Sequence, residues 1–222
     1  LQPYPNAKET FSYKITSSKS LISNDILFSP VQKIVVSSTT HIPMLELLDA
    51  ENSLVGFQNT EYISSPKTRK RIDQGFVKEL GNKGALNMEV LLDINPDLVV
   101  GFAMTSNSKV YNSVEKANIP VILNGDWLEE TPLGRAEWIK FFGVLFDKED
   151  VADSIFNAIE KNYNDAKLIA KKASIKPTIL SGAVMSKDIW SLPAGDSFVA
   201  KFLEDANTNY LWSETKDKGS LS

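Results

Sequence analysis

The chain has 222 residues, 42% of them hydrophobic, and a formal net charge of -4 at pH 7. This composition is typical of a soluble globular protein with one large or two small domains, and the negative charge gives no reason to expect nucleic acid as a partner. The chain has no cysteine and a single histidine, His41. Disulfide frameworks, iron–sulfur clusters and thiol catalysis are therefore excluded, and we expect no cofactor and no transition-metal site.

The first part of the chain alternates strand-like and helix-like segments. Short apolar runs predict buried strands at residues 33–37, 54–57, 98–102 and 119–123, and an alternating pattern predicts an edge strand at residues 11–18. Helices are predicted from about Met44 and at residues 87–94, 108–118 and 131–146. Strands separated by helices favour a parallel sheet, whose carboxyl-end loops face a ligand crevice. A long polar segment follows Phe57 and contains Pro66. Its basic cluster is predicted to be a solvated surface and comprises Lys67, Arg69, Lys70 and Arg71.

A long helix is predicted from Asp147 to Ser174, because apolar residues recur at helical spacing and no Gly or Pro interrupts them. Asp147 is the expected N-cap, and lysines near the other end suit the helix dipole. Such a helix would reach roughly 40 Å, which makes it a candidate strut between two lobes. After it come strand-like runs at residues 178–181 and 188–191 and a helical run from Phe198. These elements are too few to close a lobe, so we expect the second lobe to be incomplete.

Sequence motifs of common enzyme classes are missing. The chain lacks Gly-x-Ser-x-Gly, a Gly-rich phosphate loop, His-Glu-x-x-His and the dinucleotide glycine fingerprint. Nothing in the sequence places an activated serine beside His41. We therefore expect a protein that is not an enzyme. The alternative is an α/β enzyme for a small metabolite, with a carboxylate such as Asp126 or Glu129 as acid or base, which predicts a carboxyl group of raised pKa.

Four sequence blocks, in their order and spacing, carry a resemblance to a known family. They are Lys33–His41, Leu54–Phe57, Gly84–Val100 and Leu192–Ala200, and Asn95-Pro-Asp-Leu-Val in the third block is the most specific part. Together with the long helix they resemble the substrate-binding proteins of ABC importers for iron–siderophores, haem and cobalamin. The resemblance implies an α/β fold of two Rossmann-like lobes with mainly parallel sheets, joined by one long helix, with the ligand in the cleft. The lobes would span residues 1–146 and 175–222, and the helix residues 147–174.

The resemblance also implies a function and a location. The protein would capture an iron chelate (a siderophore complex), haem or a corrinoid, and would deliver it as a monomer to a membrane permease, in the periplasm or at the cell surface. We do not expect Leu1 to be a natural start, so a removed signal segment or tag stays open, as does a lipid anchor in the full-length precursor. The zinc and manganese branch uses several histidines, and a chain with only His41 departs from that pattern. A scaffold that keeps the fold without the ligand is a further alternative.

Five residues are candidate ligand contacts. His41 follows the first buried strand, although capping or packing is the alternative for it. Trp127 and Trp190 hold cleft-facing positions in the resemblance, where an aromatic ring can stack on a macrocycle or a catecholate, and core packing is their alternative. Arg135 could pair with ligand carboxylates or be an exposed first-turn arginine. Tyr210 could contact the ligand or fill the floor of the second lobe. Weaker candidates are Met104, Met185 and Tyr62.

Glu89 is predicted to be a docking residue for the permease. It lies in the first turn of the predicted helix 88–94, where a carboxylate suits the helix N-terminus, so an ordinary surface role is the alternative. In the cobalamin-type binding proteins that the chain resembles, a glutamate at the matching place pairs with arginines of the permease. Glu89 is therefore expected to be exposed and outside the cleft, and its counterpart on the second lobe is expected beyond Ser222.

Overall fold

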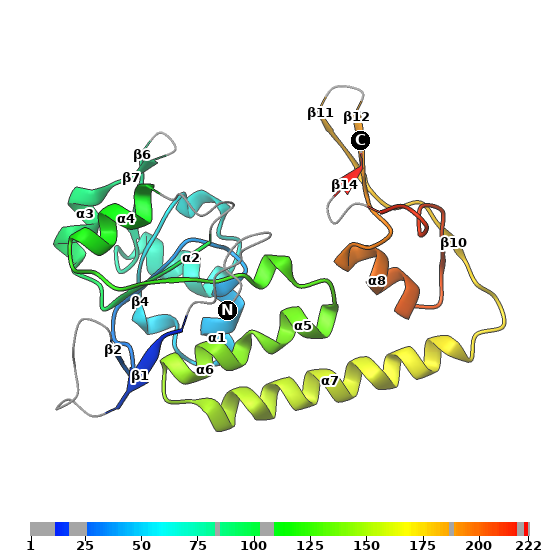
Figure 1. Ribbon diagram of the computed structural model, residues 1–222, viewed down its shortest axis with the longest axis horizontal. Helices are drawn as coiled ribbons and strands as arrows, with labels where there is room; N and C mark the ends of the chain where they lie inside the picture. The colour runs from blue at the N-terminus through cyan, green and yellow to red at the C-terminus, as the bar shows by residue number, and fades with distance from the viewer. Residues whose placement is uncertain are drawn as a thin grey trace. The chain divides into compact units, whose positions relative to one another are not determined.

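The computed structural model describes residues 12–17, 26–82, 85–102, 109–186, 189–216 and 220–221 (Figure 1). Its contacts divide the chain into two compact units. The first unit comprises Leu1–Gly125 and Ile139–Asp153, and the second comprises Asp126–Trp138 and Ser154–Ser222. Residues 126–138, which the sequence assigned to the first lobe, therefore group with the second unit. The predicted boundaries at residues 146 and 174 stay predictions for the full-length protein.

The first unit is built on a parallel sheet of five strands in the order β5-β4-β3-β8-β9. These strands are β3 (Ile34–Val36), β4 (Leu54–Phe57), β5 (Lys78–Glu79), β8 (Leu98–Gly101) and β9 (Val121–Leu123). In the central strand, Ile34 pairs with Leu54 on one side and with Leu98 on the other. All residues of β3 and β8 are buried, because a parallel sheet is covered on both faces and its strands read as continuous apolar runs. The predicted parallel sheet is confirmed.

Helices α1 (His41–Leu47), α2 (Pro66–Asp73), α3 (Met88–Ile94), α4 (Lys109–Lys116) and α6 (Ile139–Leu145) also belong to the first unit. The start of α3 is as predicted, since the Asn87 side chain accepts a hydrogen bond from the amide of Val90 at 3.2 Å. Helix α2 lies in the polar segment after Phe57, where the sequence predicted no helix, and it carries the basic cluster. It lacks an apolar stripe, but Ser65 caps it and Pro66 stands in its first turn, which are start signals visible in the sequence.

Smaller elements complete the first unit. Strands β1 (Lys14–Thr16) and β2 (Ile26–Phe28) pair in parallel, and β6 (Gly81–Asn82) and β7 (Ala85–Leu86) pair antiparallel. Part of the predicted edge strand, Phe11 and Ser18 included, lies outside the described residues. Short 3-10 turns lie at η2 (Glu51–Ser53) and η3 (Thr60–Tyr62). A core cluster joins the sheet to α3 and α4 and contains Val35, Leu80, Leu91, Val99, Val114, Ile119 and Val121.

The single helix predicted over residues 131–146 is wrong, because the chain forms two helices there. Helix α5 (Pro132–Glu137) ends at Trp138, and α6 begins at the next residue. The break coincides with the change of unit. Trp138 belongs to the second unit, whereas the fully buried side chains of Ile139, Phe142 and Leu145 belong to the core of the first.

The predicted long helix is confirmed as α7, but it is shorter than expected at both ends and runs from Glu149 to Lys171. Asp147 is not its N-cap, because this residue has a left-handed backbone with φ of 57°. An N-cap residue instead takes an extended conformation. The amide of Lys148 bonds the carbonyl of Gly143 at 2.9 Å, so the chain around Asp147 closes the end of α6 before α7 begins. Contacts assign α7 to the first unit up to Asp153 and to the second from Ser154.

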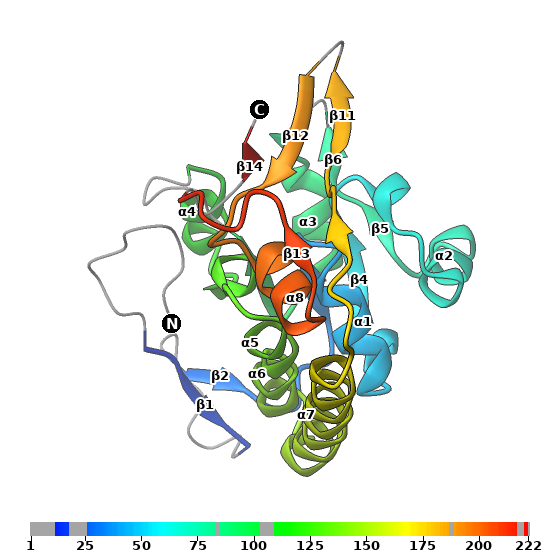
Figure 2. The same ribbon diagram turned by 90° about the vertical axis from the view of Figure 1, so that its right-hand side faces the viewer.

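The second unit is small and partial. Strand β10 (Thr178–Ile179) pairs in parallel with β13 (Asn209–Tyr210). Strands β11 (Ala183–Ser186), β12 (Ile189–Pro193) and β14 (Ser220–Leu221) form an antiparallel sheet with β12 in the middle, and Figure 2 shows β11 and β12 as a hairpin. Helix α8 (Phe198–Asp205) begins at Ser197, whose side chain accepts from the amide of Ala200. The 3-10 turn η4 (Asp126–Leu128) and helix α5 complete the unit.

Candidate functional site

The carboxyl edge of the parallel sheet in the first unit is lined with hydroxyl groups. At the end of β3, the Ser37 hydroxyl accepts hydrogen bonds from the amide of Phe102 at 3.2 Å and from the Tyr111 hydroxyl at 3.3 Å. In the following loop the hydroxyls of Ser38 and Thr40 lie 2.8 Å apart. Such an edge is where open α/β sheets bind their ligands. The structure thus places polar groups, able to donate and accept, at the expected position.

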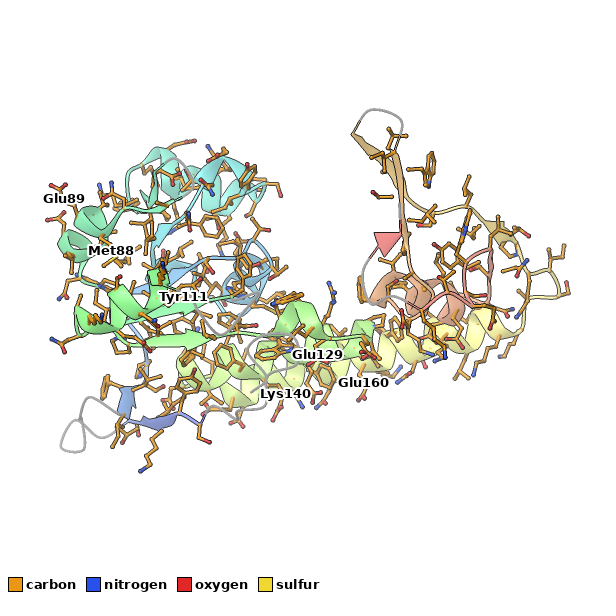
Figure 3. All side chains as sticks on the ribbon, turned by 45° about the horizontal axis from the view of Figure 1, so that its top comes forward. Met88, Glu89, Tyr111, Glu129, Lys140 and Glu160 are labelled. Atoms are coloured by element: carbon orange, nitrogen blue, oxygen red, sulfur yellow. The ribbon has the colours of Figure 1, made fainter. Side chains whose placement is uncertain are left out.

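Tyr111 was not singled out from the sequence, yet it is central to this edge. A Cβ at Gly101 would lie 2.3 Å from the Cζ atom of Tyr111, so the glycine is what lets the ring lie against the end of β8. Burial raises the pKa of Tyr111, and the bond to Ser37 offsets this only in part. The Tyr111 ring also packs against the core cluster (Figure 3). No local sequence signal marks such a contact, since Ser37 and Tyr111 are far apart in the chain.

His41 is the first residue of α1 and is completely buried. Its ring lies 5.3 Å from that of Phe142, at an interplanar angle of 54°. The side chain therefore packs in the core of the first unit, which is the alternative that the sequence left open. A ligand contact through His41 stays a prediction that would require this packing to open.

In the second unit, Trp127 and Arg135 belong to one network. Arg135 donates from Nε to the carbonyl of Glu129 and from a terminal nitrogen to the carbonyl of Trp127, both at 3.2 Å. Its guanidinium carbon lies 4.0 Å from the centre of the Phe198 ring at the start of α8. The Glu129 carboxylate accepts from the indole nitrogen of Trp138 at 3.0 Å. Trp127 is half-buried, and its indole nitrogen has no acceptor among the residues that the structure describes.

Trp190 and Tyr210 differ in exposure. Trp190 lies on β12 opposite Val184, is 40% exposed, and donates to the carbonyl of Ser181 at 3.4 Å. Tyr210 is 4% exposed and donates from its hydroxyl to the carbonyl of Pro193. Burial raises the pKa of Tyr210. An exposed indole can meet a ligand without rearrangement, whereas Tyr210 has the position expected of a residue that fills the floor of its unit.

A carboxylate in the second unit was missed by sequence reasoning. Asp205, at the end of α8 and 9% exposed, accepts from the Tyr163 hydroxyl at 2.8 Å and from the Lys167 ammonium, and Lys201 lies 3.7 Å away. Burial alone would raise the pKa of Asp205, but the bonds from Lys167 and Tyr163 and the charge of Lys201 outweigh it and hold this pKa below its usual value. Burial of Tyr163, together with its hydrogen bond to Asp205, raises the pKa of this phenol to about 12. Asp205 therefore joins α7 to α8.

Glu89 is exposed on the first turn of α3, as predicted. Figure 3 shows its side chain pointing away from the ribbon of the first unit, and the neighbouring Met88 packs partly against the core cluster. Of the weaker candidates, Tyr62 is 69% exposed, Met185 lies on β11, and Met104 lies outside the described residues. None of these positions decides what the residues bind.

The described part of the chain lacks two features. It contains no group of three or more His, Cys, Asp or Glu side chains that could hold a metal ion. Among its helices, none is both long and apolar enough to cross a bilayer.

Comparison with known proteins finds a family and a fold. A family model described as "Periplasmic binding protein" matches residues 34–222. An uncharacterized lipoprotein of Methanocaldococcus jannaschii is 24% identical over 198 residues, which are 86% of this chain and 47% of the relative. A second, uncharacterized protein of that organism is 26% identical, over 84% of this chain and 58% of its own length. The chain thus spans about half the length of the curated relatives it matches.

Two solved structures have the same fold. A protein of Staphylococcus epidermidis, described as a possible iron-binding (periplasmic solute-binding) protein, matches with a TM-score of 0.68 and 21% identity, over 87% of this chain and 71% of that one. The periplasmic haem-binding protein HutB of Vibrio cholerae matches with a TM-score of 0.68 and 16% identity, over 86% of this chain and 70% of that one. At such identities the likeness shows the fold alone.

Proposed function

Because the chain belongs to the periplasmic binding protein family, we propose that it is the ligand-binding component of an ABC importer. The observation that carries this proposal is the family match over residues 34–222, which includes the parallel sheet of the first unit and the long helix α7. In this role the protein captures a small ligand and hands it to a membrane permease, without chemistry of its own. The lipoprotein relative supports a location in the periplasm or at the cell surface, with a lipid anchor in the full-length precursor.

The proposed ligand is an iron chelate, haem or a corrinoid. Two of the fold neighbours are described as iron-binding and haem-binding proteins, which supports this class. In this proposal the rings of Trp127 and Trp190 contact the ligand, since an indole offers a large apolar face at a small cost in conformational entropy. Within the first unit taken by itself, the hydroxyl groups of Ser37, Ser38 and Thr40 at the carboxyl edge of the sheet offer hydrogen-bond donors and acceptors. The contact proposed for His41 would follow only if its buried ring were released.

Titration of the full-length protein with ferric siderophores, haem and cyanocobalamin tests the proposal, with tryptophan fluorescence as the signal. We expect one ligand class to quench the emission with micromolar affinity or better. Trp127→Phe and Trp190→Phe should weaken binding by roughly fivefold to tenfold, because a smaller ring loses stacking area. Trp212→Phe is the matched control, since this half-buried tryptophan packs at 5.9 Å from the Tyr210 ring and should leave affinity unchanged. Absence of binding across the whole panel would refute the proposed function.

Docking to the permease is proposed to use Glu89. The side chain is exposed on α3 and points away from the first unit (Figure 3), so it is free to meet a positively charged partner. Glu89→Arg in the full-length protein should leave ligand affinity intact and reduce uptake in cells, because like charges then face each other at the docking surface. Glu61→Arg, an exposed carboxylate on η3, is the control and should transport normally. Normal uptake by Glu89→Arg, or a large loss of ligand affinity, would contradict the assignment.

A further inference from the structure

The protein itself occupies one edge of the Arg135 guanidinium. Its Nε and one terminal nitrogen donate to the carbonyls of Glu129 and Trp127, each at 3.2 Å. Its flat face covers the ring of Phe198, with 4.0 Å from the guanidinium carbon to the ring centre. A carboxylate that bound this arginine bidentately along the same edge would have to displace both carbonyl groups. The geometry therefore assigns this edge of the guanidinium to the protein itself.

The two carbonyls and the ring come from different parts of the second unit. Trp127 lies in η4 and Glu129 in the loop before α5, whereas Phe198 is the first residue of α8. Arginine suits this position because a planar fork can donate along its edge while its face stacks on an aromatic ring. A lysine ammonium at the same place could not make all three contacts.

Each of the joined segments is held by further contacts of its own. Within residues 126–138, the Glu129 carboxylate accepts from the Trp138 indole at 3.0 Å, and the Thr131 hydroxyl accepts from the amide of Gly134 at 3.0 Å. Helix α8 is tied to α7 at its other end through Asp205 and Tyr163. Arg135 therefore connects an ordered turn, which contains Trp127, to a helix that is itself anchored.

We propose that Arg135 is a positioning residue, which fixes the Trp127 turn onto α8 and so sets the orientation of the indole. The inference rests on the proposed function only for the ligand contact of Trp127. A direct ion pair between Arg135 and ligand carboxylates would use the other edge of the guanidinium and stays a prediction. In the protein without ligand, Arg135 holds residues 126–138 in one conformation, and the ligand meets a ring that is already in place.

Hydrogen exchange of the full-length, ligand-free protein tests the positioning role. Arg135→Lys keeps the charge but loses the fork, so exchange of the Glu129 and Gly134 amides should accelerate by about tenfold. Phe198→Leu keeps an apolar side chain and should have a similar, smaller effect. Both variants break the same contact. The acceleration of exchange in the double variant should therefore be close to that of Arg135→Lys alone, and not to the product of the two single accelerations.

Arg71→Lys is a matched control in the first unit. Arg71 also donates to carbonyl groups, those of Asn52 at 3.1 Å and Leu54 at 3.3 Å, and its guanidinium carbon lies 5.5 Å from the centre of the Phe76 ring. Its replacement should accelerate exchange near Asn52 and leave residues 126–138 unchanged. Unchanged exchange of residues 126–138 in Arg135→Lys would overturn the proposal, whatever the protein binds.

A pair of ligand probes separates positioning from direct contact. Haem carries two carboxylates, and its dimethyl ester carries none on the same ring. If Arg135 is a positioning residue, Arg135→Lys should weaken the binding of both probes by the same factor. If Arg135 pairs with carboxylates, only the binding of haem should be weakened. A loss confined to haem would overturn the proposal. If neither probe nor any ligand of the panel binds, the proposed function fails, and the exchange result still decides the role of Arg135.

Discussion

Replacement of Asp205 by asparagine should destabilise the second unit by about 2 kcal/mol. The carboxylate is 9% exposed and holds the Tyr163 hydroxyl at 2.8 Å together with the ammonium of Lys167. A hydrogen bond to a charged group contributes about 1.5–3 kcal/mol, and the Lys201 ammonium at 3.7 Å adds less because that side chain is 37% exposed. The asparagine oxygen can still accept from Tyr163, so only the charge-dependent part is lost.

Urea unfolding, followed by tryptophan emission and by exchange of α8 amides, measures this loss. The difference between wild type and Asp205→Asn should be full at pH 7 and should vanish as the pH falls through the lowered pKa of Asp205, because the stabilising carboxylate is then protonated in the folded protein. Asp153→Asn is the control. Asp153 pairs with Lys140 at 3.4 Å, but its side chain is 56% exposed, so the replacement should lower the free energy of unfolding by less than about 0.5 kcal/mol. Equal stabilities of Asp205→Asn and wild type at pH 7 would refute the reasoning.

Three further predictions concern single groups. Gly101→Ala should lower the unfolding free energy by about 1–3 kcal/mol in thermal unfolding, because its methyl group would lie 2.3 Å from the Tyr111 ring; an unchanged melting temperature would contradict this. The Tyr163 phenol should ionise with a pKa of about 12 when followed by ultraviolet absorbance. The stability that this phenol contributes is full below the usual pKa of tyrosine and should be lost as the pH rises toward the raised pKa of the folded protein. Glu79→Gln should accelerate exchange of the Thr60 amide, which donates to the Glu79 carboxylate at 2.7 Å; unchanged exchange would show that this bond does not restrain the loop.

Much of the first unit could be predicted from the sequence. Buried strands such as Leu54–Phe57 and Leu98–Gly101 are short continuous apolar runs, and the Asn87 cap lies immediately before a helical pattern. These signals are local, because burial on both faces of a parallel sheet requires every residue of a strand to be apolar. The alternation of strands and helices then determined the parallel sheet, and the spacing of apolar residues determined the long helix α7.

The candidate site could be predicted only in part. The sequence pointed to Trp127, Arg135 and Trp190, and the structure places Arg135 in a network with the carbonyl of Trp127. The sequence could not show that the Arg135 guanidinium lies over the Phe198 ring, because Phe198 lies far along the chain and no local pattern links the two residues. The same holds for the contact of Tyr111 with Ser37 and for Asp205 between α7 and α8.

The sequence by itself determined where the regular elements of this protein form, because hydrophobic periodicity and capping act between residues close in the chain. Only the tertiary structure decided where elements break and which side chains remain available. It divided the predicted helix 131–146 at Trp138, where the chain passes from one unit to the other, and it buried His41 against Phe142. These outcomes depend on contacts between distant residues, and such contacts override local preference wherever burial stabilises more than propensity does.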